Sequence, residues 1–228
     1  MKKLIFFFYL AIASIIVSAQ NFEGVLKYDI KYEGEMVQQF AAMMPNSYTL
    51  KLKGNNSRFA IQGGMFSSFM GDIITNAKGV SYMLMPSEKI AYKISDGTEE
   101  ETKDDKLDYK VTNTGISETI KGYKCNKYKI VIEGENGEDV TTYLWASKDL
   151  DVKLPNGSSK QNAIRAYQGV EGFPVKIEQN MNQMGISFTM TILLNEAKPV
   201  AIAESEFKLP TDYKVQDGMP NFGGMMGK

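Results

Sequence analysis

From Phe22 to Tyr32 the chain reads FEGVLKYDIKY, with apolar residues or glycine at the even positions and mostly charged residues at the odd ones. This period of two is typical of a β-strand that buries one face in an antiparallel sheet. Shorter alternating runs follow at 48–53, 59–62, 80–84, 90–94, 128–132 and 142–145. Further strands are predicted at 163–167, 175–180, 187–194 and 200–209.

Turn residues separate these runs. Gly54-Asn55-Asn56 and Pro86-Ser87-Glu88-Lys89 each stand between two alternating segments, and Asn136-Gly137 suits a type I′ hairpin, which needs positive φ at both central residues. A length of 228 residues suits one domain. We therefore predict a mainly β fold, built as a curved antiparallel sheet or half-open barrel of roughly ten strands.

Two Met/Phe-rich segments interrupt the strand pattern. The first, at 36–44, has helical spacing and ends at Pro45, and the second, at 65–70, lies between glycines. We expect one or two short helices over the open side of the sheet. Methionine is flexible and suits varied apolar partners, although it is also a common filler of protein cores. The predicted ligand-lining residues are Met36, Phe40, Met43, Met44, Met65, Phe66, Phe69 and Met70.

The N-terminus has the features of an export signal. Lys2 and Lys3 precede the apolar run Leu4–Val17, and Ala19 ends a small-residue cleavage site. The run is shorter than a membrane-spanning helix needs, so we prefer a cleaved signal peptide to a retained anchor. The predicted divisions are a signal peptide at 1–19, one β-rich domain at 20–217 and a flexible Gly/Met-rich tail at 218–228. Because no cysteine stands at the cleavage point, we expect a periplasmic or secreted protein rather than a lipoprotein.

Composition excludes several chemistries. The chain has no histidine and one cysteine, so it lacks Ser-His-Asp and Cys-His machinery and an internal disulfide. Lys and Arg number 26 against 27 Asp and Glu, which gives a net charge of −1 and no footprint for nucleic acid. We expect no enzyme activity, no cofactor, no metal, and no membrane span after signal cleavage.

Sharper chemical interpretations remain as alternatives. The acidic run 96–108 could bind calcium, and Met181 with Met184 could bind copper(I). Glycosidase carboxylates could be drawn from pairs such as Asp149 with Asp151 or Glu171 with Glu178. Cys125 is predicted to be a small buried hydrophobe. The two arginines, Arg58 and Arg165, could each hold an anionic head group, but a solvated strand-face position is the simpler interpretation.

The tail carries its own pair of alternatives. Met219, Phe222, Met225 and Met226 stand among glycines, and Gly and Pro favour neither helix nor strand. We expect a frayed terminus. The alternative is that these side chains fold back over the open side of the sheet until a ligand displaces them.

Several motifs together resemble a known family. They are IKGYKCNKY at 120–128, Trp145, GFPVKIE at 172–178, LMP at 84–86 with Ala91-Tyr92, and LPTDYK at 209–214. This layout resembles an exported Bacteroidota family catalogued as domain of unknown function 4412, with GYKC at 122–125 as its most specific element. The resemblance implies an architecture similar to the lipoprotein carriers LolA and LolB, which are half-open antiparallel barrels closed by small helices over an apolar cavity. It implies no catalytic residue.

Two hypotheses for function follow. In the first, a LolA/LolB-like half barrel in the cell envelope binds an apolar or amphipathic, lipid-like molecule between its sheet and the Met/Phe-rich segments. In the second, the same apolar surface binds an envelope protein, because exposed apolar patches also mark partner surfaces. A concave patch favours the ligand, and a flat patch favours the protein partner.

Overall fold

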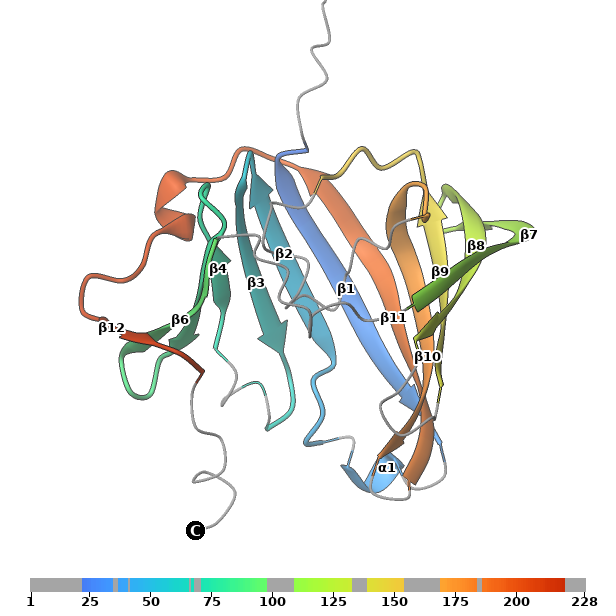
Figure 1. Cartoon of the computed structure of the whole chain (residues 1–228), viewed down its shortest axis with the longest axis horizontal. Helices are drawn as coiled ribbons and strands as arrows, with labels where there is room; N and C mark the ends of the chain where they lie inside the picture. The colour runs from blue at the N-terminus through green and yellow to red at the C-terminus, as the bar shows by residue number, and fades with distance from the viewer. Residues whose placement is uncertain are drawn as a thin grey trace, which may run out of the picture.

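The structure, a computed structural model, describes residues 22–34, 37–40, 42–65, 67, 71–97, 109–132, 139–153, 169–183 and 186–219. Within these residues twelve strands form one sheet (Figure 1). The first six strands are β1 Gly24–Glu33, β2 Ser47–Lys53, β3 Asn56–Gln62, β4 Ile73–Thr75, β5 Val80–Met85 and β6 Ile90–Asp96. The others are β7 Tyr109–Ile120, β8 Tyr123–Ile132, β9 Val140–Ser147, β10 Phe173–Gln183, β11 Ile186–Pro199 and β12 Lys214–Asp217.

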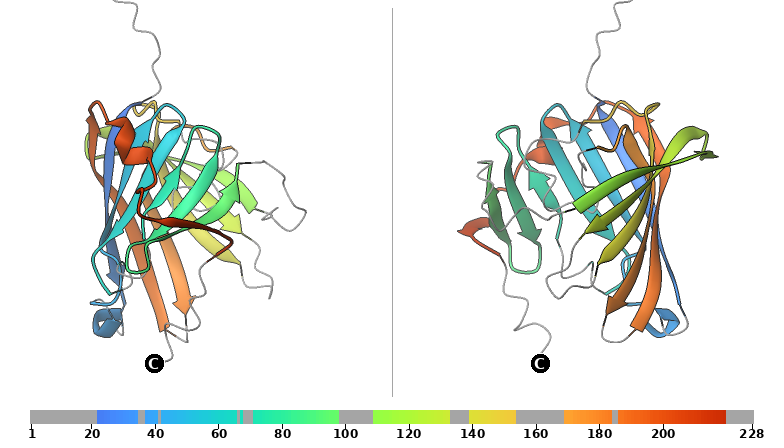
Figure 2. Two further views of the ribbon diagram at one scale, coloured as in Figure 1. Left: turned by 90° about the vertical axis from the view of Figure 1, so that its left-hand side faces the viewer. Right: turned by 45° about the vertical axis from the view of Figure 1, so that its right-hand side comes forward.

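The sheet consists of two meanders joined at its centre. Strands β1 to β6 pair in chain order, as do β7 to β11, and β1 pairs with β11 in the antiparallel sense. The short strand β12 pairs in parallel with β6 and forms one edge, whereas β7 forms the other. Figure 2 shows that both edges curve toward the same side, so the sheet is a half-open barrel with a concave and an outer face. The predicted fold class is confirmed.

Strand alternation divides the apolar residues between the two faces. On β1, Leu26 and Tyr28 point into the concave side and are fully buried, whereas Lys27 between them forms an ion pair with Glu196. The other strands continue this pattern and build one concave core. Its fully buried large side chains include Tyr28, Tyr48, Tyr128, Leu26, Leu50, Leu52, Met85, Ile130, Leu144 and Leu194.

A second, smaller core lies on the outer face. Ile74, Leu84 and Ala91 of strands β4 to β6 pack there against Ile202 and Phe207 of the segment after β11. This segment contains the 3-10 helix η2, Glu204–Phe207, and ends in β12 (Figure 1). The C-terminal segment therefore crosses the outer face before it pairs with the edge strand β6.

The strand predicted at 200–209 is wrong. Ile202 and Phe207 are buried against the outer face by an extended stretch and one 3-10 turn, and not by strand pairing. Pro199 and Pro210 flank the segment and have no amide proton for a sheet ladder. Strands β4, β7 and β12 were not predicted. The strand predicted at 163–167 and the Asn136-Gly137 turn lie outside the described residues.

Helix is scarce in the described chain. The helix predicted at 36–44 is limited to α1, Val37–Phe40, which lies beyond the end of β1. A turn follows, in which the amide of Met43 donates to the carbonyl of Phe40. Within the described residues no helix has the length and apolarity needed to cross a membrane. The predicted signal peptide and residues 220–228 of the predicted tail lie outside the described part.

Candidate ligand site at one end of the half barrel

The burial of the concave face changes along β1. Along β1, Leu26 and Tyr28 are buried, whereas Ile30 and Tyr32, nearer α1, are only partly buried. Strands β3, β8 and β10 show the same change toward this end, whereas Tyr48 of β2 and Phe188 of β11 are buried there. The partly buried apolar residues there include Ile61 on β3, Ile132 on β8, Met181 on β10 and Met190 on β11. Apolar side chains are thus exposed to solvent at the α1 end of the half barrel.

The two Met/Phe-rich segments meet at this end. Gly64 follows β3 with a φ of +66°, and its backbone lies so close to the carbonyl oxygens of Met43 and Met44 that a Cβ atom would collide with them. The amide of Asn46 also donates to the carbonyl of Gln62. The structure therefore brings together two segments that the sequence predicted separately.

The predicted site residues divide into two groups. Phe40 and Met65 are exposed, at 41% and 54% of their surface. Met43 and Met44 are partly buried. All four lie at the α1 end. The other four, Met36, Phe66, Phe69 and Met70, fall where the structure does not describe a side chain. Whether any of the eight contacts a ligand stays a prediction.

An aromatic row lies deeper in the concave core. The rings of Tyr28 and Tyr48 stack with centroids 4.7 Å apart, and Phe59 follows at 5.1 Å from Tyr48. The Tyr28 hydroxyl donates to the carbonyl of Pro174 over 2.8 Å. The Tyr48 hydroxyl is buried without a hydrogen-bond partner among the described residues. Burial raises the pKa of both tyrosines well above the usual value, so both hydroxyls are protonated.

This row is not among the site residues predicted from the sequence. The alternating run at 48–53 predicts a strand, but this pattern says nothing about the partners of the Tyr48 hydroxyl. One sequence signal could have indicated the aromatic row, namely tyrosine on the inner face of a predicted barrel. A buried tyrosine hydroxyl needs a hydrogen-bond partner.

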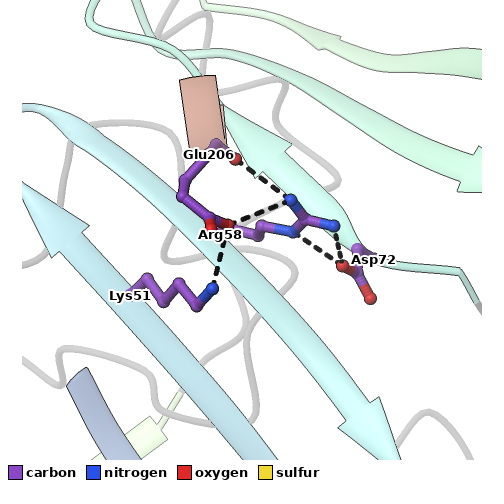
Figure 3. A network of polar contacts seen from close by, with 4 residues as sticks. All are labelled: Lys51, Arg58, Asp72 and Glu206. Carbon is purple, nitrogen blue, oxygen red and sulfur yellow. Dashed lines mark hydrogen bonds and ion pairs between the residues drawn. The ribbon is translucent and has the colours of Figure 1, made fainter. Parts of the chain in front are cut away.

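Charged side chains lie outside the buried interior. Among the described residues, no Lys, Arg, Asp or Glu is fully buried. On the outer face, Arg58 of β3 binds Asp72 over 2.6 Å and Glu206 of η2 over 3.3 Å, and Lys51 binds Glu206 over 2.8 Å (Figure 3). Arg58 therefore holds two carboxylates of its own chain. Arg165, the other arginine, lies outside the described residues.

A polar pocket adjoins this network. Its volume is about 270 Å³, and its lining includes Thr49, Lys51, Arg58, Gln62, Asp72 and Glu206. The two cations and two carboxylates in the lining already bind one another. Ala60 and Ile61 complete the lining, and the ion pairs of the pocket hold the C-terminal segment.

Three of the four carboxylates considered for catalysis, Asp149, Glu171 and Glu178, bind cations or backbone. Glu171 binds Lys148 over 2.6 Å and Glu178 binds Lys176 over 2.7 Å. Lys148 lowers the pKa of Glu171, whereas a general acid at neutral pH needs a raised pKa. Asp149 accepts a hydrogen bond from the amide of Lys124.

The remaining chemical alternatives gain no support from the described residues. Cys125 is buried as predicted, and burial raises the pKa of its thiol, which keeps it protonated and unreactive. The described residues hold no group of three acidic or cysteine side chains placed for a metal ion. Met184 and the acidic residues from 98 to 108 lie outside the described part.

Comparisons with solved structures give distant likenesses. A structure of PNGF-II is 16% identical with a TM-score of 0.49, and the match covers 85% of this chain but only 30% of that one. The LolA superfamily protein NE2245 from Nitrosomonas europaea is 14% identical (TM-score 0.35, 84% of this chain and 91% of that one). LprF from Mycobacterium bovis is 10% identical (TM-score 0.37, 84% and 90%). At these scores the likeness bears on neither ligand nor activity.

The family comparison is more direct. Among curated proteins, none matches the chain. One family model, however, matches residues 22–213, a range that contains strands β1 to β11 and η2. The GYKC motif at 122–125 falls within this range, at the turn between β7 and β8 and the start of β8. The chain therefore belongs to the family described as domain of unknown function DUF4412.

Proposed function

We propose that the protein is a non-catalytic carrier of the cell envelope that binds an apolar or amphipathic, lipid-like ligand on the concave side of its half barrel. One observation carries the proposal: toward the α1 end, apolar side chains that continue the concave core, among them Ile30, Ile61 and Met190, are only partly buried. Apolar side chains left partly exposed in a concave surface are the usual lining of a ligand site. We assign Phe40, Met43, Met44 and Met65 to the entrance of this site, because Phe40 and Met65 are exposed and Met43 and Met44 are partly buried.

The location in the envelope rests on the sequence. Residues 1–19 have the features of a cleaved signal peptide, and no cysteine stands at the cleavage point. We therefore place the mature chain, from residue 20, in the periplasm or outside the cell. N-terminal sequencing of the protein purified from the cell envelope tests this location. A chain that still begins at Met1 in the membrane fraction would contradict it.

Ligand binding is tested on the mature chain. Native mass spectrometry before and after lipid extraction should reveal a co-purifying molecule, and the extracted protein should bind a fluorescent apolar probe. Phe40→Lys and Met65→Lys should each weaken probe binding at least threefold, because each places a charge at the apolar entrance. Val200→Lys is the matched control, since Val200 is 40% exposed but follows the opposite end of β11.

The alternative function is binding of an envelope protein through the same entrance residues. The exposure of Phe40 and Met65 favours it, because such side chains also mark partner surfaces. The two functions differ in one outcome. If the wild-type protein binds no apolar probe, yet crosslinking in cells captures a reproducible partner that Met65→Lys abolishes, the partner function replaces the carrier function.

A further inference from the structure

The polar pocket on the outer face has room for a small molecule. Its volume of about 270 Å³ falls below the roughly 300–1,000 Å³ of pockets that take drug-sized ligands. Residues of β2 and β3 provide most of its lining, and Asp72 and Glu206 lie beside them (Figure 3). The pocket therefore suits a ligand about the size of one sugar ring.

Two uncharged polar side chains of the lining are available to a ligand. Thr49 of β2 is partly buried, and Gln62 at the end of β3 is exposed. Neither side chain forms a hydrogen bond within the described part of the chain. A hydroxyl both donates and accepts a hydrogen bond, and an amide group has two N–H donors and a carbonyl acceptor. Thr49 and Gln62 can thus bind the hydroxyl groups of a ligand.

The ion pairs around Arg58 leave further hydrogen-bonding groups unused. Arg58 binds Asp72 only through Oδ2 (Figure 3). Lys51 and Arg58 bind the carboxylate of Glu206 only through Oε2. The second oxygen of each carboxylate accepts no hydrogen bond from the described residues. Lys51 uses one of its three N–H donors in this network. A ligand can therefore bind here while every ion pair stays intact.

The charges of the lining favour an uncharged ligand. Two cations and two carboxylates line the pocket and neutralise one another. An ionic group would have to separate one of these pairs to gain a partner, whereas a hydroxyl needs only the unused groups. Ala60 adds a methyl group to the lining. Sugars and cyclic polyols match this combination, because they carry hydroxyls at the ring edge and C–H groups on the ring faces.

We propose that this pocket binds a small uncharged polyhydroxylated molecule, a monosaccharide unit or a polyol of the same size, and that Thr49 and Gln62 determine its specificity. The inference is independent of the proposed function, because strand alternation puts the pocket across the sheet from the concave core. It assigns the protein a second ligand class, distinct from the lipid-like ligand of the concave side.

Titrations followed by the amide NMR signals of the mature protein test the pocket. The uncharged probes are glucose, galactose, mannose and N-acetylglucosamine. At least one should bind with a Kd in the millimolar range, as is usual for a small polar ligand, and should shift the amide signals of Thr49, Ala60 and Gln62. Glucuronate and glucosamine, the latter at about pH 6 with its amine protonated, should bind more weakly than the best uncharged sugar.

Two variants remove the proposed contacts. Thr49→Val and Gln62→Leu should each weaken binding of that sugar about three- to tenfold, because each removes hydrogen bonds to the ligand but none within the protein. Thr191→Val is the matched control, since Thr191 is also a partly buried threonine of the outer face but lies on β11, outside the pocket lining. It should keep the wild-type affinity. All three variants should keep the wild-type melting temperature.

A trisaccharide of the bound sugar identifies the source of the ligand. Binding at least as tight as that of the monosaccharide indicates the end of a glycan chain, whereas loss of binding indicates a free sugar.

Three results would overturn the inference. They are that no uncharged sugar shifts the pocket signals, that both variants keep the wild-type affinity, or that glucuronate or glucosamine binds more tightly than every uncharged sugar. The last result would make the pocket an ion site. No sugar should displace a fluorescent apolar dye, and displacement would place the sugar on the concave side and also overturn the inference. The carrier function is judged separately, by binding of the dye itself.

Discussion

Arg58 on β3 binds Glu206 on η2, although 148 residues separate them in the sequence. The guanidinium reaches both the carboxylate and the backbone carbonyl of Glu206 at 3.3 Å, and its other nitrogens bind Asp72. These side chains are 29–35% exposed, so solvent screens them only in part. The contact ties the C-terminal segment to the outer face of the first meander.

Arg58→Met should therefore destabilise the fold. We expect a loss of about 1–2 kcal/mol in the free energy of unfolding, because two carboxylates lose a charged donor. Urea unfolding measures the change. Lys27→Met is the control: Lys27 binds Glu196 with both side chains about half exposed, and its removal should cost at most about 0.5 kcal/mol. Equal losses in the two variants would contradict the role of Arg58.

Protonation of Glu206 in acid should lower the free energy of unfolding. The hydrogen bond from Lys51, with the charges of Lys51 and Arg58, lowers the pKa of Glu206 below its ordinary value of 4.5. A carboxyl whose pKa is lowered on folding stabilises the folded state above its unfolded pKa, and this contribution is lost as the pH falls through the folded pKa. Wild-type stability should thus decline below pH 4.5, and Glu206→Gln should decline less steeply.

Hydrogen exchange locates that acid effect. The amide of Lys214 donates to the carbonyl of Lys89, just before β6, and the amide of Gly218 donates to that of Lys93 in β6, so these two amides report whether β12 remains paired. At neutral pH these amides should exchange faster in Glu206→Gln than in the wild type, and the difference should shrink below pH 4.5 as Glu206 itself becomes protonated. An effect confined to β7 and β8, on the far edge, would refute this assignment.

Gly64 should be the most sensitive glycine at the proposed ligand entrance. Gly64→Ala forces a side chain into a φ of +66° and into the carbonyls of Met43 and Met44. Gly54→Ala has a similar φ of +55° but open space around it, so it isolates the backbone strain of about 1 kcal/mol. Gly64→Ala should cost more than Gly54→Ala and should weaken binding of the apolar probe, which Gly54→Ala should not.

Trp145, the one tryptophan of the chain, lies between a lysine of β8 and a lysine of β10. Lys127 and Lys176 place their ammonium groups 4.6 and 4.4 Å from its ring centroid, and the residue is 3% exposed. Lys127→Met keeps the apolar stem but removes the charge, so it should cost about 0.5–1 kcal/mol and change the fluorescence of Trp145. Lys129→Met, an exposed lysine on the same strand, should leave both unchanged.

The fold could be predicted where alternation is strong. β1 and β2 bury one face each, so their sequences carry a clear period of two. β7 was missed because it is exposed on nearly every residue, so no alternation marks it. Its turn to β8 is formed by Lys121 and Gly122, both with positive φ, and a lysine there gives little signal. β12 depends on pairing with β6, which local sequence does not encode.

The site could be predicted only in part. Methionine and phenylalanine at helical spacing indicated two apolar segments, and the structure brings those segments together through Gly64. The sequence could not show that Phe40 and Met65 lie at the α1 end of the concave face. The burial of residues along a strand depends on neighbours that are far away in the chain. The isolation of the Tyr48 hydroxyl depends on tertiary contacts in the same way.

The junction of β1 with β11 also determines the order of events during folding. Strands β1 to β6 can pair as they leave the ribosome, since each meets its neighbour in chain order. The free edge of β1, however, can pair only after residues 186–199 have been made. The free edge of β6 can pair only after residues 214–217 have been made. Contacts so distant in sequence close slowly, because loop entropy opposes them. Until the last strands are made, the first meander presents two open edges, and the nascent protein is most prone to aggregation in that interval.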